Sequence, residues 1–133
     1  MPTGPRRRTI IPESGRSPTP RLLIAVALGG FGLYRALYVP AMLVGPPVPP
    51  ALVGFLLQAV FGILAGISVW RGARSAPILI VLLGASIAAT ALVEGFVFGI
   101  IPYLRALLEA VAAIVVALLI AMYVKGLGAT ATR

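Results

Sequence analysis

Four long apolar runs occupy most of the chain between residues 21 and 125, and short polar stretches separate them. A membrane-spanning helix needs roughly 17–25 apolar residues, because each residue adds about 1.5 Å along the axis. We therefore expect spans at about 22–40, 51–70, 77–98 and 103–124. Because the connections are short, consecutive helices should be antiparallel neighbours. The pattern predicts an all-α, integral membrane four-helix bundle.

The regions around these spans have a different composition. Residues 1–20 are rich in Pro, Arg, Ser, Thr and Gly, which is typical of a disordered basic tail. The prolines within 45–50 predict a turn between the first two spans, since proline lacks an amide hydrogen and cannot continue a helix. Residues 126–133 should form a second short tail. We expect one bundle, 21–125, between two tails.

Most of the basic residues gather on one side of the predicted spans, the side that holds both termini. The positive-inside rule predicts that this side is cytoplasmic, and a bacterial inner (plasma) membrane fits that sidedness. Anionic lipids are the expected partners of the basic tail. The tail has no aromatic residues to stack on bases, which argues against nucleic acid. The topology determinants are Arg6, Arg7, Arg8, Arg71, Arg74 and Lys125.

Spans two and four share a short pattern. Residues 56–60 read LLQAV, and residues 107–111 read LLEAV. The two spans run in the same direction, so the match is consistent with a parallel duplication of a two-helix hairpin. Chance matches are also common in segments rich in Ala, Leu and Val, and both interpretations stay open.

The composition excludes several kinds of chemistry. The chain contains no Cys, His or Asp, and its three acids are Glu13, Glu94 and Glu109. This removes disulfides, Cys- or His-ligated metals, and nucleophiles activated by histidine. We expect no metal and no cofactor, and the sequence argues against an enzyme.

Five polar residues fall in the outer half of the predicted spans, where charged groups are costly and usually face the bundle interior. In one interpretation they form a sealed ion-pair network that fixes helix register, and Arg105 could pair with Glu109 four residues later. In the other they line a small polar pocket that opens outward. The five are Arg35, Gln58, Glu94, Arg105 and Glu109.

Small residues recur at helical spacing and predict where helix backbones approach closely. Each of these stripes leads toward a strongly polar residue, or has one beside it. We expect the stripes of all four spans to face one another inside the bundle. The helix-packing candidates are Gly29, Gly32, Gly62, Gly66, Ala113 and Ala117.

The segment GILAG at 62–66 leads to the basic turn RGAR at 71–74 and then to an apolar third span, and Arg35 stands late in span one. Together with the size and the four spans, this layout resembles the DoxX-like family of small four-helix membrane proteins. Members often carry an acid in span two where this chain has Gln58, so no acid role is carried over to that position. Some members are linked to quinone-associated oxidoreductase complexes, which implies a quinone-linked partner.

Because reactive groups are few, the sequence favours a non-catalytic accessory or assembly subunit of a membrane complex. Its expected partners are the lipid bilayer and either another membrane protein or a second copy. The alternative is a small transporter or a lipid- or quinone-binding protein that uses the outer-half polar cluster. A third hypothesis is a quinone-linked enzyme subunit, in which Arg35, Tyr34 and Tyr38 hydrogen-bond a quinone head group and a partner supplies the electron carrier.

Overall fold

The computed structural model describes residues 19–45 and 49–130. The predicted basic tail, including Arg6, Arg7 and Arg8, lies outside these residues except for its last two positions. No strand occurs in the part of the chain that is described, and the prediction of an all-α protein is confirmed. The elements are α1 (Thr19–Val44), α2 (Pro49–Arg71), α3 (Ala76–Leu92), the short π-helical η1 (Val93–Val97) and α4 (Tyr103–Thr130).

Four helical segments are long and apolar enough to cross a membrane: α1, α2, α3 together with η1, and α4. The structure agrees at this level with the predicted multi-pass bundle. In the described residues, large apolar side chains such as Leu37, Val44 and Met122 remain exposed around the bundle, as a lipid surrounding requires.

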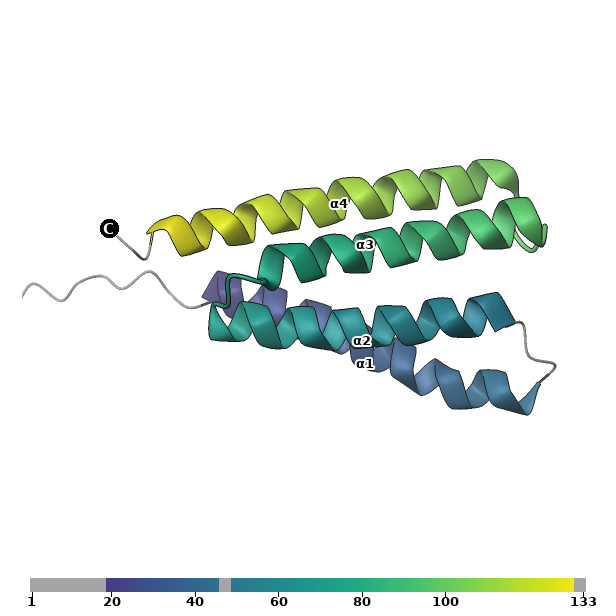
Figure 1. Ribbon diagram of the computed structural model, residues 1–133, viewed down its shortest axis with the longest axis horizontal. Helices are drawn as coiled ribbons and strands as arrows, with labels where there is room; N and C mark the ends of the chain where they lie inside the picture. The colour runs from purple at the N-terminus through teal and green to yellow at the C-terminus, as the bar shows by residue number, and fades with distance from the viewer. Residues whose placement is uncertain (1–18, 46–48, 131–133) are drawn as a thin grey trace, which may run out of the picture.

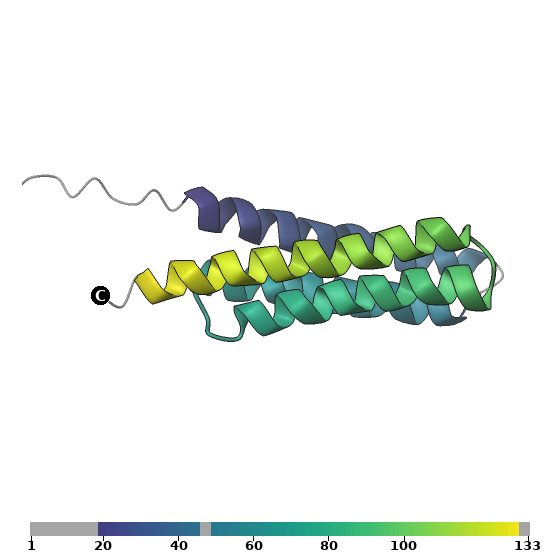
Figure 2. The same cartoon turned by 90° about the horizontal axis from the view of Figure 1, so that it is seen from above.

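The helices form two antiparallel hairpins, α1 with α2 and α3 with α4, and α2 packs against α3 (Figure 1). The start of α1, the α2–α3 connection and the end of α4 lie together at one end, here called the termini end (Figures 1 and 2). The opposite end carries the α1–α2 and α3–α4 connections and is called the hairpin end. α1 crosses α2 obliquely, and α1 and α4 hardly approach each other.

Glycines hold α1 and α2 in direct backbone contact. A Cβ atom added to Gly32 would lie 2.5 Å from the backbone nitrogen of Ile63. One added to Gly66 would lie 2.7 Å from the backbone nitrogen of Gly29, and one added to Gly62 would meet Gly32 at 2.7 Å. No side chain fits at Gly32, Gly62 or Gly66, and Gly29 lies beside Gly66 in the same tight seam.

A similar seam joins α3 to α4. Gly84 of α3 faces Ala113 and Ala117 of α4, and a Cβ atom at Gly84 would collide with the Cβ of Ala117. The small-residue stripes of α1 and α2 therefore face each other, and the stripe of α4 faces α3 at Gly84. The predicted stripe of α3 meets α2 instead, where Thr90 packs on Gly54 and accepts a hydrogen bond from Gln58.

Two helices extend beyond their expected ends. α1 contains Pro40 and continues to Val44, and α4 continues to Thr130 through most of the expected second tail. Proline removes one backbone donor, but ending the helix there would leave several backbone groups without partners in an apolar surrounding. Gly126 and Gly128 each cost a helix about 1 kcal/mol, and they do not stop α4.

Two glycines with positive φ allow the tight connections. Gly72 (φ 65°) reverses the chain between α2 and α3, and Gly99 (φ 63°) follows η1. At η1 the N–H of Phe98 donates to the carbonyl of Val93 at 3.2 Å, the five-residue spacing of a π turn. Glu94, one of the predicted site residues, therefore lies inside a π-helical turn.

Candidate functional site

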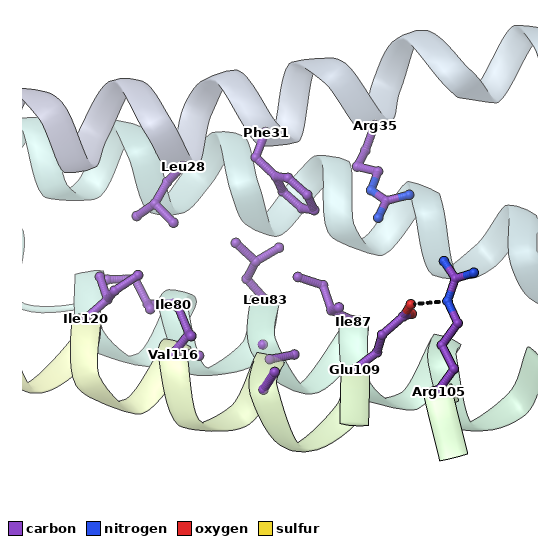
Figure 3. A pocket seen from close by; sticks show the side chains of 14 residues that line it. Leu28, Phe31, Arg35, Ile80, Leu83, Ile87, Arg105, Glu109, Val116 and Ile120 are labelled. Carbon is purple, nitrogen blue, oxygen red and sulfur yellow. Dashed lines mark hydrogen bonds and ion pairs between the residues drawn. The ribbon is translucent and has the colours of Figure 1, made fainter. Parts of the chain in front are cut away.

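A cleft of about 590 Å³ lies between α1 and α4, with α3 along its third side (Figure 3). In Figure 3 the side chains of Leu28, Phe31 and Arg35 on α1 face α4 across this gap. The cleft has an apolar part, formed mainly by Leu28, Ile80, Leu83, Val116 and Ile120, and a charged part, formed by Arg35, Arg105 and Glu109.

The spacing between α1 and α4 follows from side-chain size. The face of α1 toward α2 carries glycines, whereas the face toward α4 carries Leu28, Phe31 and Arg35. Large side chains keep the axes apart where glycines would let them touch. The same helix thus makes backbone contact on one side, whereas on the other it borders the cleft and contributes the buried Leu28 to a core shared with Ile80, Leu83 and Ala117.

A smaller cavity of about 60 Å³ adjoins the charged part of the cleft, and we call it the chamber. Arg35, Ile87 and Glu109 line both spaces. The chamber has room for a few water molecules or for one small polar group. Its other lining residues are Phe55, Gln58, Thr90, Ala91 and Glu94.

Arg35 lies between two aromatic rings. Its guanidinium carbon is 4.5 Å from the ring centroid of Phe55 and 5.1 Å from that of Phe31. Such cation–π contacts stabilise a guanidinium in apolar surroundings. They leave the N–H groups at the guanidinium edge available, and the buried Nε has no hydrogen-bond partner among the described residues.

Gln58 is completely buried between helices. Its Nε2 donates to the Thr90 hydroxyl at 3.1 Å, and that hydroxyl donates to the Ser86 carbonyl at 2.8 Å. The side-chain oxygen of Gln58 has no partner within the described part of the chain. A buried acceptor without a partner costs about 1–3 kcal/mol. Two residues that line the chamber thus carry a buried polar atom without a partner in the described residues, a donor on Arg35 and an acceptor on Gln58.

Across residues 19–45 and 49–130 the one ion pair joins Arg105 Nε to Glu109 Oε1 at 2.7 Å. Both side chains are largely exposed, and both belong to α4. This pair therefore cannot tie one helix to another, as the sealed-network interpretation requires. The polar contacts that do connect helices are the Gln58–Thr90 hydrogen bond and the stacking of Arg35 on Phe55.

All five predicted polar residues border these two spaces. Arg35, Gln58, Glu94 and Glu109 line the chamber, and Arg105 lines the cleft beside Glu109. The two tyrosines considered for a quinone head group do not line either space. Their hydroxyls bond to each other at 3.1 Å on the exposed side of α1.

Sequence reasoning missed the aromatic residues Phe31 and Phe55. The available signal is their spacing: Phe31 stands four residues before Arg35, and Phe55 stands three residues before Gln58. Residues three and four apart share a helix face. Aromatic residues on the face of an intramembrane arginine or glutamine are thus candidates for its surroundings.

The described residues contain no group of three or more acids, histidines or cysteines that could hold a metal ion. The chain matches no protein-family model, and neither a curated protein nor a solved structure shows significant similarity to it. The resemblance to the DoxX-like family stays a prediction based on the residues alone.

Proposed function

We propose that this chain is a non-catalytic membrane protein that binds one amphiphilic molecule in the α1–α4 cleft. The apolar tail of the ligand lies against Leu28, Leu83 and Ile120, and its polar head lies beside Arg35 at the chamber. Binding sites of this kind are mostly apolar, with a few polar groups that fix the orientation of the ligand.

The observation that carries this proposal is the junction of the cleft with the chamber. An apolar space of about 590 Å³ meets a polar one of about 60 Å³ at Arg35 and Glu109. Two residues that line the chamber carry buried polar atoms without partners in the described part of the chain, the Nε of Arg35 and the side-chain oxygen of Gln58. A ligand that supplies these two hydrogen bonds removes the cost of leaving them unmade.

The two unpaired atoms also narrow the chemistry of the head group. The Arg35 N–H requires an acceptor, and the Gln58 oxygen requires a donor. A hydroxyl group provides both, whereas a quinone carbonyl provides only an acceptor. The charges of Arg35, Arg105, Glu94 and Glu109 also sum to zero in their ionised forms, so the site has no excess charge to neutralise. A neutral, hydroxylated head group, as in a lipid alcohol or a quinol, fits best.

A second candidate is the accessory or assembly subunit. The two helices that flank the cleft bury the smallest share of their apolar stretches, 17% each, against 39% for α2 and 33% for α3 with η1. A partner's transmembrane helix on α1 and α4 would cover these faces. In both proposals the termini face the cytoplasm of a bacterial inner membrane, and membership of the DoxX-like family belongs to the same set of proposals.

Native mass spectrometry on protein released gently from its own membrane tests these proposals. We expect one bound amphiphile per chain. Ala112→Phe should abolish its retention, because Ala112 is exposed and lines the cleft, where a phenyl ring would occupy the ligand volume. The matched control is Ala89→Phe, also on an exposed helical position but away from the cleft.

If the Ala112→Phe and Ala89→Phe variants retained equal amounts of the amphiphile, binding in the cleft would be refuted. A stoichiometric protein in place of the amphiphile, displaced by Ala112→Phe alone, would support the accessory subunit instead.

A further inference from the structure

The termini end holds another space, separate from the cleft and the chamber. It has a volume of about 510 Å³ and lies among the start of α1, the α2–α3 connection and the end of α4. Each of these segments contributes one cation: Arg21, Arg74 and Lys125. Val69, Pro77 and Val124 form its apolar wall. We call it the basic pocket.

The α2–α3 connection brings two of these cations to one place. Gly72 has a positive φ, and a Cβ atom there would lie 3.2 Å from a terminal guanidinium nitrogen of Arg21. The guanidinium of Arg21 therefore lies over the turn that carries Arg74. The turn is closed by the Ala73 N–H, which donates to the Ser68 carbonyl at 2.8 Å.

No acid balances these charges in the described residues. Glu94 and Glu109 line the chamber instead, and the one described ion pair is Arg105 with Glu109. Like charges that share one pocket repel each other, and the repulsion is larger beside an apolar wall than in water. An anion in the pocket would attract all three cations and so offset their mutual repulsion.

We propose that the basic pocket binds the phosphate head group of one anionic phospholipid from the leaflet at the termini end. Basic pockets between transmembrane helices are a recurring way to hold such head groups. The three cations would surround the phosphodiester, and the glycerol and acyl chains would follow the wall of Val69, Pro77 and Val124. This site is independent of the amphiphile proposed for the cleft.

A phospholipid is favoured over a free phosphate ion as the ligand of the basic pocket, for two reasons. The pocket joins cations to an apolar wall, which a free ion would leave uncovered. It also lies at the termini end, and the residues that follow Val69 and precede Val124 of its wall are the exposed aromatic residues Trp70 and Tyr123. Aromatic residues of this kind are enriched at the head-group level of a bilayer.

Native mass spectrometry of the full chain provides the test, after reconstitution in phosphatidylcholine nanodiscs that contain a small share of phosphatidylglycerol. The wild-type protein should retain one phosphatidylglycerol per chain and saturate there. Arg74→Gln should weaken this binding about tenfold, because it removes a charged hydrogen-bond donor from the site.

Arg71→Gln is the matched control, since Arg71 is next to the same connection but lines the groove between α1 and α2 instead. It removes the same charge from the same interface, so any effect on membrane orientation should be equal in the two variants. Its binding should stay within about twofold of wild type, because Arg71 does not line the basic pocket and a charge outside the site contributes little. Both residues are exposed, so neither change should disturb folding.

Two results would overturn the proposal. Equal weakening by Arg71→Gln and Arg74→Gln would mean a general attraction of lipids to a positive surface. Thermal stabilisation of the lipid-free protein by inorganic phosphate, equal to that by phosphatidylglycerol, would replace the lipid with a free phosphate. The amphiphile in the cleft should be retained in both variants, so failure here leaves the proposal for the cleft unaffected.

Discussion

The two faces of α1 pack in opposite ways. Toward α2 the helix presents Gly29 and Gly32, and the two backbones touch. Toward α4 it presents Leu28, Phe31 and Arg35, and a cleft of about 590 Å³ remains. One helix thus serves both as a packing surface and as the wall of a site. The difference shows that residue size on each face, rather than overall hydrophobicity, decides which helices close together.

The largest expected effect on stability comes from disturbing the face of α1 that packs on α2. Gly32→Ala should lower the free energy of unfolding by about 3 kcal/mol, because its methyl group would overlap the backbone of α2. Reversible unfolding in detergent measures this change. Gly30→Ala is the control: Gly30 is exposed in mid-helix with open space around it, so the change should raise the free energy of unfolding by about 1 kcal/mol. Equal effects of the two changes would show that the α1–α2 seam does not determine stability.

A second change tests the face of α1 that borders the cleft. Arg35→Lys keeps the charge but removes the planar group that stacks between Phe31 and Phe55 and the Nε donor at the chamber. Affinity for the co-purified amphiphile should fall about tenfold, as for the loss of a hydrogen bond to a charged group. Titration of delipidated protein in nanodiscs measures it, with unfolding monitored in parallel. Undiminished affinity would show that the head group does not bind at Arg35.

The smallest effect on stability is expected from a change in α4, on the opposite side of the cleft. Glu109→Gln breaks the ion pair with Arg105, which is exposed and contained within one helix. Such pairs contribute little to stability. The melting temperature should therefore not change measurably in a thermal scan. A decrease as large as that caused by Gly32→Ala would revive the idea that charges near the hairpin end fasten the helices together.

The helices and the polar cluster could be predicted from the sequence because both depend on local spacing. Apolar runs of sufficient length give the spans, and the separations between Gly62 and Gly66 or between Arg105 and Glu109 place those residues on shared faces. The cleft could not be predicted, because it depends on which face of α1 turns toward α4, and that orientation results from many contacts together. The end of α1 was misjudged at Pro40, because the cost of a proline was not weighed against the cost of ending a helix in lipid.

The hydrogen bonding of Gln58 shows a further limit of sequence reasoning. Gln58 and Thr90 are 32 positions apart, and only the packing of α2 on α3 makes them partners. The same packing leaves the side-chain oxygen of Gln58 buried with no partner among the described residues. Hydrogen-bond satisfaction is a property of the assembled bundle, and residue type alone does not reveal it.

The π turn at η1 places a constraint on chain length. A π turn holds one residue more than an α turn, so removing one residue there would turn the flanking helix by about 100°. Glu94 would then leave the chamber wall, or Gly95 would lose its close packing on Ala106. Homologous chains should therefore keep the number of residues between Thr90 and Ala106 constant, and insertions or deletions should fall in other connections.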